Sequence, residues 1–288
     1  MEDQAKHLRA MVKNQMLNIQ TKTIAVVSGK GGVGKSNFSL NFAISLSKRG
    51  HSVLVFDLDI GMGNIDILMG LSSKYSIADF FLNQVPLKEM ITVVPEGIHY
   101  ISGGTGLSVL TKISQESFDH FSKQFSLLLS NYEYIIFDMD AGIHENSLRF
   151  ILAVDEIMVI TTPEPTSITD AYAAMKYITM ENQSIPLYII INRAQSEKEG
   201  ISTFNRISKV LNHFLNKNAT LLGILPDDQI IPQAVRKQTP FVQLNERSPA
   251  SKALKRLTEV YCLQDNKPFS SYTKVNFVAK LKRFLFER

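Results

Sequence analysis

The chain has 288 residues, of which 44% are hydrophobic and 20% charged, and this composition excludes disordered, collagen-like and coiled-coil rod proteins. Its one cysteine, Cys262, excludes an intramolecular disulfide and a cysteine-rich metal site, so we expect a reducing, cytoplasmic location. The net charge of +4 is unevenly spread, because residues 274–288 carry +4 and residues 1–20 carry +1, which leaves −1 for residues 21–273.

Residues 1–20 are the first predicted element. Charged residues interrupt Met1–Arg9, so we expect no secretory signal there. Apolar residues recur at helical spacing, which predicts an appended N-terminal helix; they are Ala5, Leu8, Val12 and Met16. Further along the chain the longest apolar runs have the length of strands, so we expect no membrane-spanning helix.

Residues 21–263 alternate short β-branched runs with longer amphipathic stretches, which is the pattern of βαβ units. Several runs are apolar throughout, as strands covered on both faces are. We therefore expect a single α/β domain, a P-loop domain with a mostly parallel central sheet flanked by helices. The expected strands are 23–28, 52–57, 98–102, 134–138, 156–161, 187–192 and 220–225, and the expected helices are 35–49, 115–130, 146–153, 167–181, 200–215 and 249–261. A polar linker, residues 264–273, then precedes an amphipathic helix, residues 274–288.

A glycine-rich loop follows the first expected strand and opens directly into a helix, which is the context that a P-loop requires. Its residues are Gly29, Lys30, Gly31, Gly32, Val33, Gly34, Lys35 and Ser36, and Asn37 completes the predicted nucleotide-binding segment. Glycines let backbone N–H groups surround phosphate oxygens at a positive helix N-terminus. We expect Lys35 to reach the β/γ-phosphates and the Ser36 hydroxyl to bind Mg²⁺.

Carboxylates end two of the expected strands. Asp138 follows four apolar residues in the Walker-B arrangement, which holds hydrated Mg²⁺. Asp57 and Asp59 end the second strand, where alternation points both to one side, toward the phosphates. With a P-loop upstream, a metal-binding or water-positioning role is the better interpretation than a helix cap.

The loop contains an extra lysine, Lys30, ahead of its glycines, and this feature is typical of one family of P-loop proteins. The chain resembles the deviant Walker-A family of MinD and ParA ATPases over most of residues 21–263. Besides the loop, the matching segments are Asp57-Leu58-Asp59, Phe137-Asp138-Met139-Asp140-Ala141-Gly142, Thr162-Pro163-Glu164-Pro165, Asn192-Arg193 and Pro226-Asp227-Asp228.

The resemblance implies an ATP-dependent homodimer in which two subunits enclose two ATP molecules, hydrolyse them slowly to ADP with Mg²⁺, and act as a nucleotide switch. Lys30 would reach the partner's phosphates and Asp59 would activate water, so the implied catalytic residues are Lys30, Lys35 and Asp59. The implied metal set is Ser36, Asp59 and Asp138, with Asp138 acting through water.

The resemblance also implies that adenine is contacted by Asn192, Arg193, Pro226 and Asp227. The alternative for Asn192 is a cap on the following helix. One departure concerns Asp140, which stands two residues after the Walker-B acid where the family commonly has proline. An extra carboxylate there could alter metal geometry or the rate of hydrolysis, so the rate of relatives is not transferred to this chain.

Residues 274–288 combine charge with an apolar stripe. At 100° per residue the stripe covers an arc of about 120°; it holds Phe277, Val278, Leu281, Phe284 and Leu285, with Lys280 and Arg283 opposite. Such a helix is typical of one that lies in a bilayer interface. We expect peripheral binding to the anionic inner face of the cell membrane, strengthened when two tails act together in a dimer. The alternative is a last helix packed on the sheet, which the polar linker and the concentrated charge disfavour.

The N-terminal segment contains Asp3-Gln4-Ala5-Lys6-His7-Leu8-Arg9, which resembles the activator motif of the FlhG-type branch of the family. That branch governs the number and placement of bacterial flagella, stimulates the signal-recognition-type GTPase FlhF and contacts flagellar C-ring components. The resemblance implies that Asp3, Gln4, Ala5, Leu8 and Arg9 bind the partner, with Gln4 and Arg9 offered to its GTP site.

Four other functions share part of these patterns. A MinD-type division-site ATPase would share the fold and the membrane tail, but the N-terminal motif and Asp140 argue against it. A ParA-type DNA-partitioning ATPase would need basic patches on the body, which nets −1, so we expect no specific nucleic acid as partner. An iron–sulfur carrier would need paired cysteines. A scaffold that binds ATP without hydrolysing it stays open.

Overall fold

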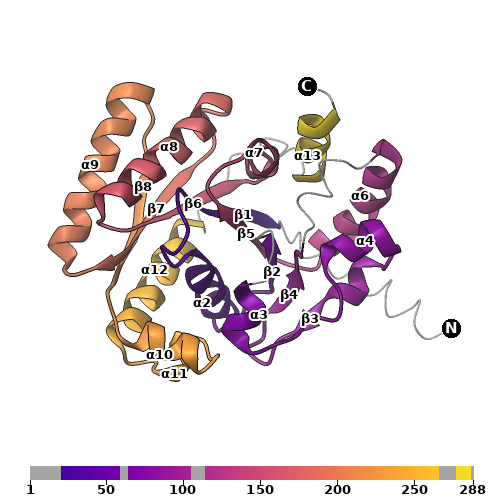
Figure 1. Ribbon diagram of the computed structural model, residues 1–288, viewed down its shortest axis with the longest axis horizontal. Coiled ribbons are helices and arrows are strands. Elements are labelled where there is room, and N and C mark those ends of the chain that lie inside the picture. Colours follow the sequence, from indigo (N-terminus) through magenta and orange to yellow (C-terminus); the bar gives the residue numbers. More distant parts are fainter. Residues whose placement is uncertain (1–20, 59–63, 105–113, 266–276, 287–288) are drawn as a thin grey trace.

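The computed structural model describes residues 21–58, 64–104, 114–265 and 277–286 (Figure 1). Within them, eight strands form one sheet in the order β3-β4-β2-β5-β1-β6-β7-β8. Only the β3–β4 pair is antiparallel among the pairs of this sheet. The strands are β1 Lys22–Ser28, β2 Val53–Leu58, β3 Thr92–Val93, β4 His99–Ser102, β5 Tyr134–Ala141, β6 Glu156–Thr161, β7 Leu187–Ala194 and β8 Thr220–Pro226. The predicted fold class, a P-loop α/β domain, is confirmed.

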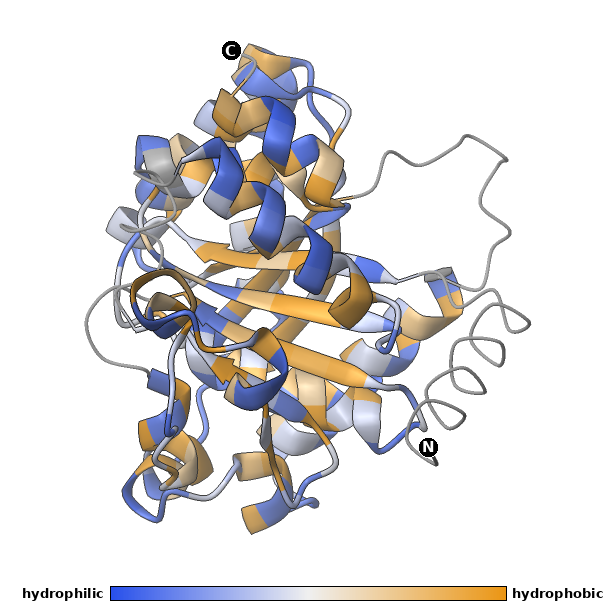
Figure 2. Cartoon of the chain, turned by 90° about the vertical axis from the view of Figure 1, so that its right-hand side faces the viewer, coloured by the Kyte–Doolittle hydropathy of each residue, from blue (hydrophilic) through white to orange (hydrophobic). Residues whose placement is uncertain are grey.

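Helices cover both faces of the sheet (Figures 1 and 2). One face carries α4 Ile77–Asn83, η1 Leu87–Met90, α6 Gln115–Leu129, α7 Glu145–Ala153, α8 Pro165–Glu181, α9 Glu197–Leu215 and α13 Phe277–Phe286. The other carries α2 Lys35–Ser47, α3 Asn64–Met69, α10 Ile230–Arg236, α11 Phe241–Leu244 and α12 Pro249–Asp265. No described helix combines the length and the apolar character needed to cross a membrane.

The central strands show why the sheet needs both layers. All seven residues of β1 are buried, and they alternate between the two cores: Ala25 and Val27 pack on the side of α8, and Ile24 and Val26 pack on the side of α2. Apolar side chains on both faces stabilise a strand only where helices exclude water from each face. The apolar runs of the sequence therefore predicted these strands well.

The elements that the sequence did not predict are short. They are β3, α3, α4, η1, α10 and α11. They have two to seven residues each, which leaves too few positions for a periodic pattern to be recognised. In addition, α12 continues to Asp265, past the expected domain end at residue 263, and the proposed domain boundaries stay predictions.

The last helix differs from expectation. Phe277, Val278, Leu281 and Phe284 of α13 are 4%, 6%, 2% and 8% exposed, because the apolar stripe packs into the core beside α6 and α7. The ring of Phe277 stacks on Phe137 of β5 at 5.1 Å between centroids. The prediction that the polar linker leaves this stripe free is wrong for this conformation. Periodicity identifies the apolar face of a helix but not what covers it.

Two of the tail's lysines also contact the body. The Lys280 ammonium lies 3.1 Å from Asp155, and the Lys282 ammonium lies 2.8 Å from Asp119 of α6. Arg283 is exposed. Part of the tail's positive charge is therefore paired within the protein, although residues 274–276 and 287–288 lie outside the described residues.

Candidate nucleotide-binding site

The loop between β1 and α2 has a backbone that requires glycine at two points. A Cβ on Gly29 would lie 2.1 Å from the carbonyl carbon of Asp170 in α8, so the loop approaches that helix too closely for any side chain. Gly34 has φ of +93°, and a Cβ there would lie 2.4 Å from Nδ2 of Asn192. The predicted P-loop therefore has the sharp turn at a helix N-terminus that brings backbone N–H groups toward an anion.

Lys35 and Asp138 form the buried centre of the site. The Lys35 ammonium donates to Oδ1 of Asp138 at 3.0 Å, and the Ser39 hydroxyl donates to the same oxygen at 2.9 Å. The Lys35 side chain is 7% exposed and that of Asp138 is fully buried. The structure thus brings the P-loop lysine and the Walker-B acid together, although 103 residues separate them.

The second oxygen of Asp138 indicates which kind of group the site fits. Oδ2 is buried and has no hydrogen-bond partner among the described residues. A buried carboxylate oxygen left unpaired costs free energy, so such atoms mark sites that an ion or water completes. No cluster of three or more acidic, histidine or cysteine side chains in the described residues could hold a metal alone. This donor set fits Mg²⁺, which keeps several waters and takes its other ligands from phosphates.

Asp57 lies beside Asp138 in the sheet, since the two are partners in the β2–β5 register. Its Oδ2 accepts a hydrogen bond from the backbone N–H of Ile65 at 3.1 Å and one from the Tyr100 hydroxyl at 3.5 Å. Burial, and then the neighbouring carboxylates, raise the pKa of Tyr100 well above its usual range, so this hydroxyl stays protonated and donates. Asp57 therefore anchors α3, while Asp59 lies outside the described residues.

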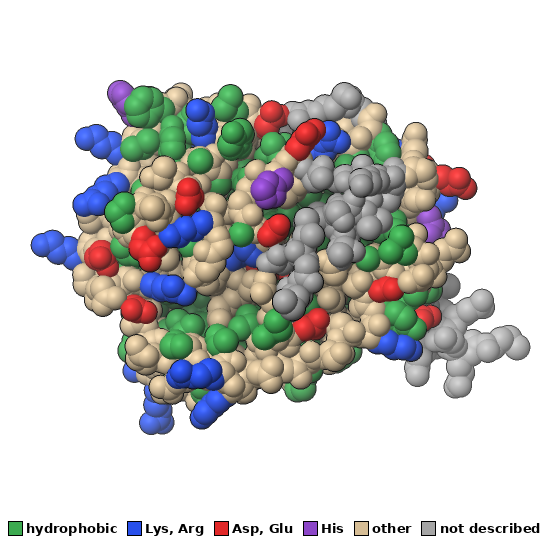
Figure 3. Space-filling model, in the orientation of Figure 1, with side chains coloured by type: hydrophobic (Ala, Val, Ile, Leu, Met, Phe, Trp, Pro, Cys, Tyr) green, Lys and Arg blue, Asp and Glu red, His purple; other side chains and the backbone are tan. Residues whose placement is uncertain are grey.

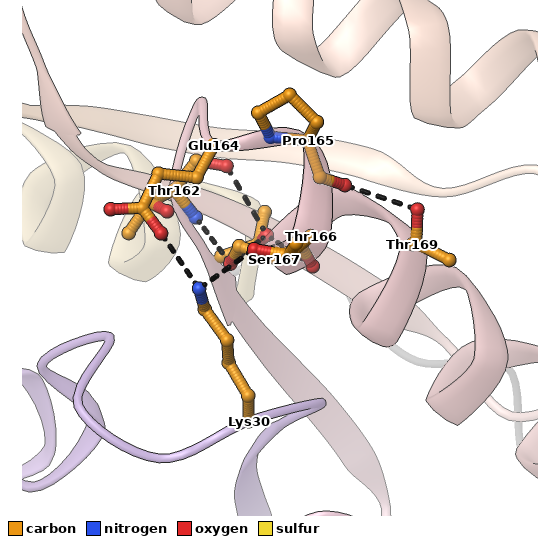
Figure 4. A network of polar contacts seen from close by, with 8 residues as sticks. Lys30, Thr162, Glu164, Pro165, Thr166, Ser167 and Thr169 are labelled. Atoms are coloured by element: carbon orange, nitrogen blue, oxygen red, sulfur yellow. Dashed lines mark hydrogen bonds and ion pairs between the residues drawn. The ribbon is translucent and has the colours of Figure 1, made fainter.

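Lys30 is held by its own subunit (Figure 4). Its ammonium lies 2.7 Å from Oε2 of Glu164 and 3.0 Å from Oγ1 of Thr166, at the start of α8. The side chains of Lys30 and Glu164 are 30% and 60% exposed. Hydrogen bonding and the positive charge of Lys30 lower the pKa of Glu164, with a smaller effect from Arg193. Sequence reasoning missed Glu164 as the counter-ion, although it stands in the matched segment Thr162–Pro165.

A cavity of about 820 Å³ opens beside the P-loop. Five predicted residues line it, namely Gly34, Asn37, Asn192, Arg193 and Asp227. Pro226 does not line it; this residue lines a separate cavity beside β8. Sequence reasoning missed the apolar side, which comes from Ile231, Pro232, Val235 and Phe241 of the short helices α10 and α11. No periodic pattern in the sequence predicted these two helices.

Asn192 lines the nucleotide cavity, so its predicted adenine contact stays a prediction, and the structure also gives it a contact with the P-loop. Its Nδ2 donates to the carbonyl of Val33 at 2.7 Å, and its Oδ1 accepts from the N–H of Arg193 at 3.0 Å. The following helix is capped by Ser196, whose hydroxyl accepts from the Glu199 N–H, so the capping alternative is wrong. Asn192 ties the P-loop to β7 and helps to fix the shape of the phosphate site.

Asp140 turns toward its own backbone. Its Oδ1 accepts from the N–H of Ala141 at 2.6 Å, and the side chain is only partly buried. The extra carboxylate near the Walker-B strand therefore has one oxygen already hydrogen-bonded. Its effect on hydrolysis stays a prediction.

Comparisons with known proteins agree with this geometry. Residues 19–261 match the family model ParA, described as NUBPL iron-transfer P-loop NTPase. The antiactivator FleN of Pseudomonas aeruginosa is 32% identical over 238 residues, which cover 83% of this chain and 85% of FleN. The flagellum site-determining protein YlxH of Helicobacter pylori is 38% identical over 220 residues, which cover 76% of this chain and 74% of YlxH.

The fold is also found among solved structures. The septum site-determining protein MinD of Pyrococcus horikoshii, complexed with Mg-ADP, superposes with a TM-score of 0.69 at 22% identity. The match covers 86% of this chain and 98% of that chain. At this identity the match supports the fold alone.

Proposed function

The chain belongs to the ParA family of P-loop NTPases, and on this premise we propose that it is a slow, Mg²⁺-dependent ATPase that dimerises around ATP and regulates the number and placement of flagella. The observation that supports ATPase activity is the buried Lys35–Asp138 pair, in which one carboxylate oxygen has no hydrogen-bond partner among the described residues. The flagellar part is supported by the 38% identity to a flagellum site-determining protein and by the N-terminal motif.

In this proposal the P-loop binds the phosphates of ATP. Backbone N–H groups between Gly29 and Lys35 surround the phosphate oxygens, and the Lys35 ammonium balances their charge. Ser36 and Asp138 hold Mg²⁺, because hydroxyl and carboxylate oxygens are its preferred ligands. The bound ion neutralises charge that develops on the transferred phosphoryl group. Asp59 orients the attacking water.

Lys30 supplies the link between ATP and dimerisation. To reach the partner's phosphates it must leave Glu164 and Thr166, which hold it in the single subunit. Because both ends of this ion pair are substantially exposed, water replaces the lost contacts at small cost. The ammonium therefore exchanges one anionic partner for another as the dimer closes.

Residues 1–20 would act on a GTPase of the FlhF type. Gln4 and Arg9 are offered to its GTP site, and Leu8 docks beside them. A peptide of residues 1–20 should raise GTP turnover by that partner, and Gln4→Ala should abolish the effect. A peptide without effect would remove this segment from the proposal. Contact with C-ring components is proposed for other surfaces and does not depend on this result.

Membrane binding is proposed for α13, at the inner face of the cell membrane. Its apolar stripe packs in the body, so this stripe must leave the core before it enters a bilayer. Arg283, which is exposed, allows a test that leaves the packed face intact. We expect Arg283→Glu to weaken co-sedimentation with anionic vesicles in the presence of ATP, and Arg206→Glu on α9 to leave it unchanged. Equal binding by parent and Arg283→Glu would contradict this role.

The central test is the mass of the protein in solution. We expect a monomer with ADP and a dimer with a non-hydrolysable ATP analogue, and phosphate release by the parent that Asp59→Ala and Lys35→Gln abolish. A parent that dimerises without releasing phosphate would instead be an ATP-binding scaffold. Iron transfer, which the description of the family model names, is not proposed, because Cys262 is the chain's single cysteine.

A further inference from the structure

A third cavity lies on the side of the sheet that α2 and α12 cover. It is a groove of about 780 Å³ between the C-terminal end of α2, the residues from α11 to the start of α12, and the first half of α12. Its charged residues are Lys48, Arg49, Arg247, Lys252 and Lys255 on the basic side and Glu246 and Glu259 on the acidic side. In Figure 3 basic side chains gather at the lower left, where Figure 1 places α10 and α11.

The carboxylates of the groove are already paired. Glu246 lies 2.6 Å from the Lys48 ammonium, and Glu259 lies 3.7 Å from the Arg49 guanidinium. Hydrogen bonding and charge attraction from Lys48, with a smaller contribution from Lys255, lower the pKa of Glu246, so it remains ionised. Within the described residues, the side chains of Arg247, Lys252 and Lys255 make no ion pair. The groove thus keeps three uncompensated positive charges on a body that nets −1.

Two of the three cations lie near the N-terminal end of helix α12. The helix begins at Pro249 and has no acidic residue in its first turn, while Lys252 and Lys255 lie in its first two turns. The N-terminal end of a helix carries partial positive charge and favours anions, so cations there are repelled. The Asp228 carboxylate accepts a hydrogen bond from the N–H of Ala250 at this end of the helix. An anionic ligand in the groove would in addition attract the ammonium groups of Lys252 and Lys255.

We propose that this groove docks an acidic peptide segment of a partner protein. Carboxylates of the segment would pair with Arg247, Lys252 and Lys255. Beside the cations the lining holds the apolar side chain of Val242 and the hydroxyl groups of Ser45 and Ser251, which suits a peptide with mixed side chains. Duplex nucleic acid is the less favoured occupant, because its non-specific binding depends on contacts with many successive phosphates and the groove offers three cations outside its ion pairs.

The wall of the groove also borders the nucleotide cavity. Neighbouring residues of α11 face different spaces, since Phe241 lines the nucleotide cavity and Val242 lines the groove. The N–H of Val242 donates to Oδ1 of Asn41 in α2 at 3.1 Å, and the N–H of Ala250 donates to Asp228, which lines the nucleotide cavity, at 3.0 Å. A nucleotide that shifts α11 would therefore change the groove, and docking would depend on the nucleotide state. This dependence rests on the proposed function, whereas docking itself does not.

The test uses the full chain and a fluorescein-labelled peptide rich in Glu and Asp, with binding measured by fluorescence anisotropy. We expect the double variant Lys252→Glu/Lys255→Glu to bind at least about tenfold more weakly than the parent. The matched control is Lys198→Glu/Lys209→Glu, which reverses two exposed lysines of α9 outside the groove and should leave binding unchanged. Equal unfolding midpoints in urea would show that both variants fold.

Three outcomes would overturn the docking site: equal loss in the α9 control, no loss in the groove variant, or stronger binding of duplex DNA or anionic vesicles through the same two lysines. If docking depends on the nucleotide state, the affinity for the peptide should differ between the protein with ADP and the protein with the ATP analogue. Equal affinities would overturn this dependence. A chain that binds no nucleotide but still binds the peptide would contradict the proposed ATPase and support the docking site.

Discussion

The two lysines of the P-loop occupy opposite environments although only four residues separate them. Lys35 is 7% exposed and pairs with a fully buried carboxylate, whereas Lys30 is 30% exposed and pairs with Glu164, which is 60% exposed. A buried pair is costly to break, because the remaining charge has no water to solvate it. An exposed pair exchanges partners readily. The same loop thus contains one lysine suited to hold a fixed site and one suited to move between subunits.

The largest expected effect comes from breaking the buried pair. Asp138→Ala leaves the Lys35 ammonium without its carboxylate, and we expect the free energy of unfolding to fall by about 3–5 kcal/mol in urea titrations. Phosphate release should be lost, because a proposed ligand of Mg²⁺ is removed. Asp155→Ala, which removes a partly exposed partner of Lys280, is the comparison variant and should retain turnover. Undiminished turnover in Asp138→Ala would remove Asp138 from the site.

The next effect concerns the loop that carries both lysines. Gly34→Ala places a Cβ 2.4 Å from the Asn192 amide at φ of +93°, and strain of this kind costs about 1–3 kcal/mol. We expect ATP affinity, measured by calorimetry, to fall by about tenfold or more. Gly50 has the same φ with no atom near its Cβ position, so Gly50→Ala is a matched control for backbone strain alone. If both variants bind ATP equally, the tight approach to Asn192 has no role in binding.

A smaller effect is expected at the exposed lysine. Glu164→Gln weakens the hold on Lys30, so the dimer should form at ATP-analogue concentrations about twofold to fivefold lower, as measured by light scattering. Lys30→Met should abolish the dimer. Glu145→Gln, which removes an exposed pair with Arg149 on α7, should change nothing. Impaired dimerisation in Glu164→Gln would mean that Glu164 acts in the dimer rather than in the single subunit.

The smallest predicted effect concerns the pKa of the Glu164 carboxyl group. Lys30 holds the pKa of Glu164 below its usual range. A depressed carboxylate pKa in the folded protein contributes stability that is present above the unfolded-state pKa, about 4.3, and is lost as the pH falls through the lower folded value. We therefore expect the Lys30–Glu164 pair to persist from pH 5 to pH 8. NMR titration of the Glu164 side chain checks this, and in Lys30→Met its pKa should rise.

Local sequence patterns predicted the centre of the domain well. The strand Lys22–Ser28, the loop up to Ser36 and the helix from Lys35 each have a pattern that repeats over several residues or a motif of defined spacing. Asp138 was found because a buried strand led directly to it. The apolar wall of the nucleotide cavity was not found, because α10 and α11 are too short to show a period.

By itself the sequence determined the fold class, the P-loop and the Walker-B carboxylate that pairs with Lys35, since burial of alternating apolar side chains and the geometry of glycine act locally along the chain. Only the tertiary structure decided which charges pair: Lys30 with Glu164, Asn192 with the P-loop backbone, and Lys280 with Asp155. It also decided that the apolar stripe of α13 is covered by the body. Such contacts join residues more than a hundred positions apart, and no local pattern encodes which distant surface a side chain meets.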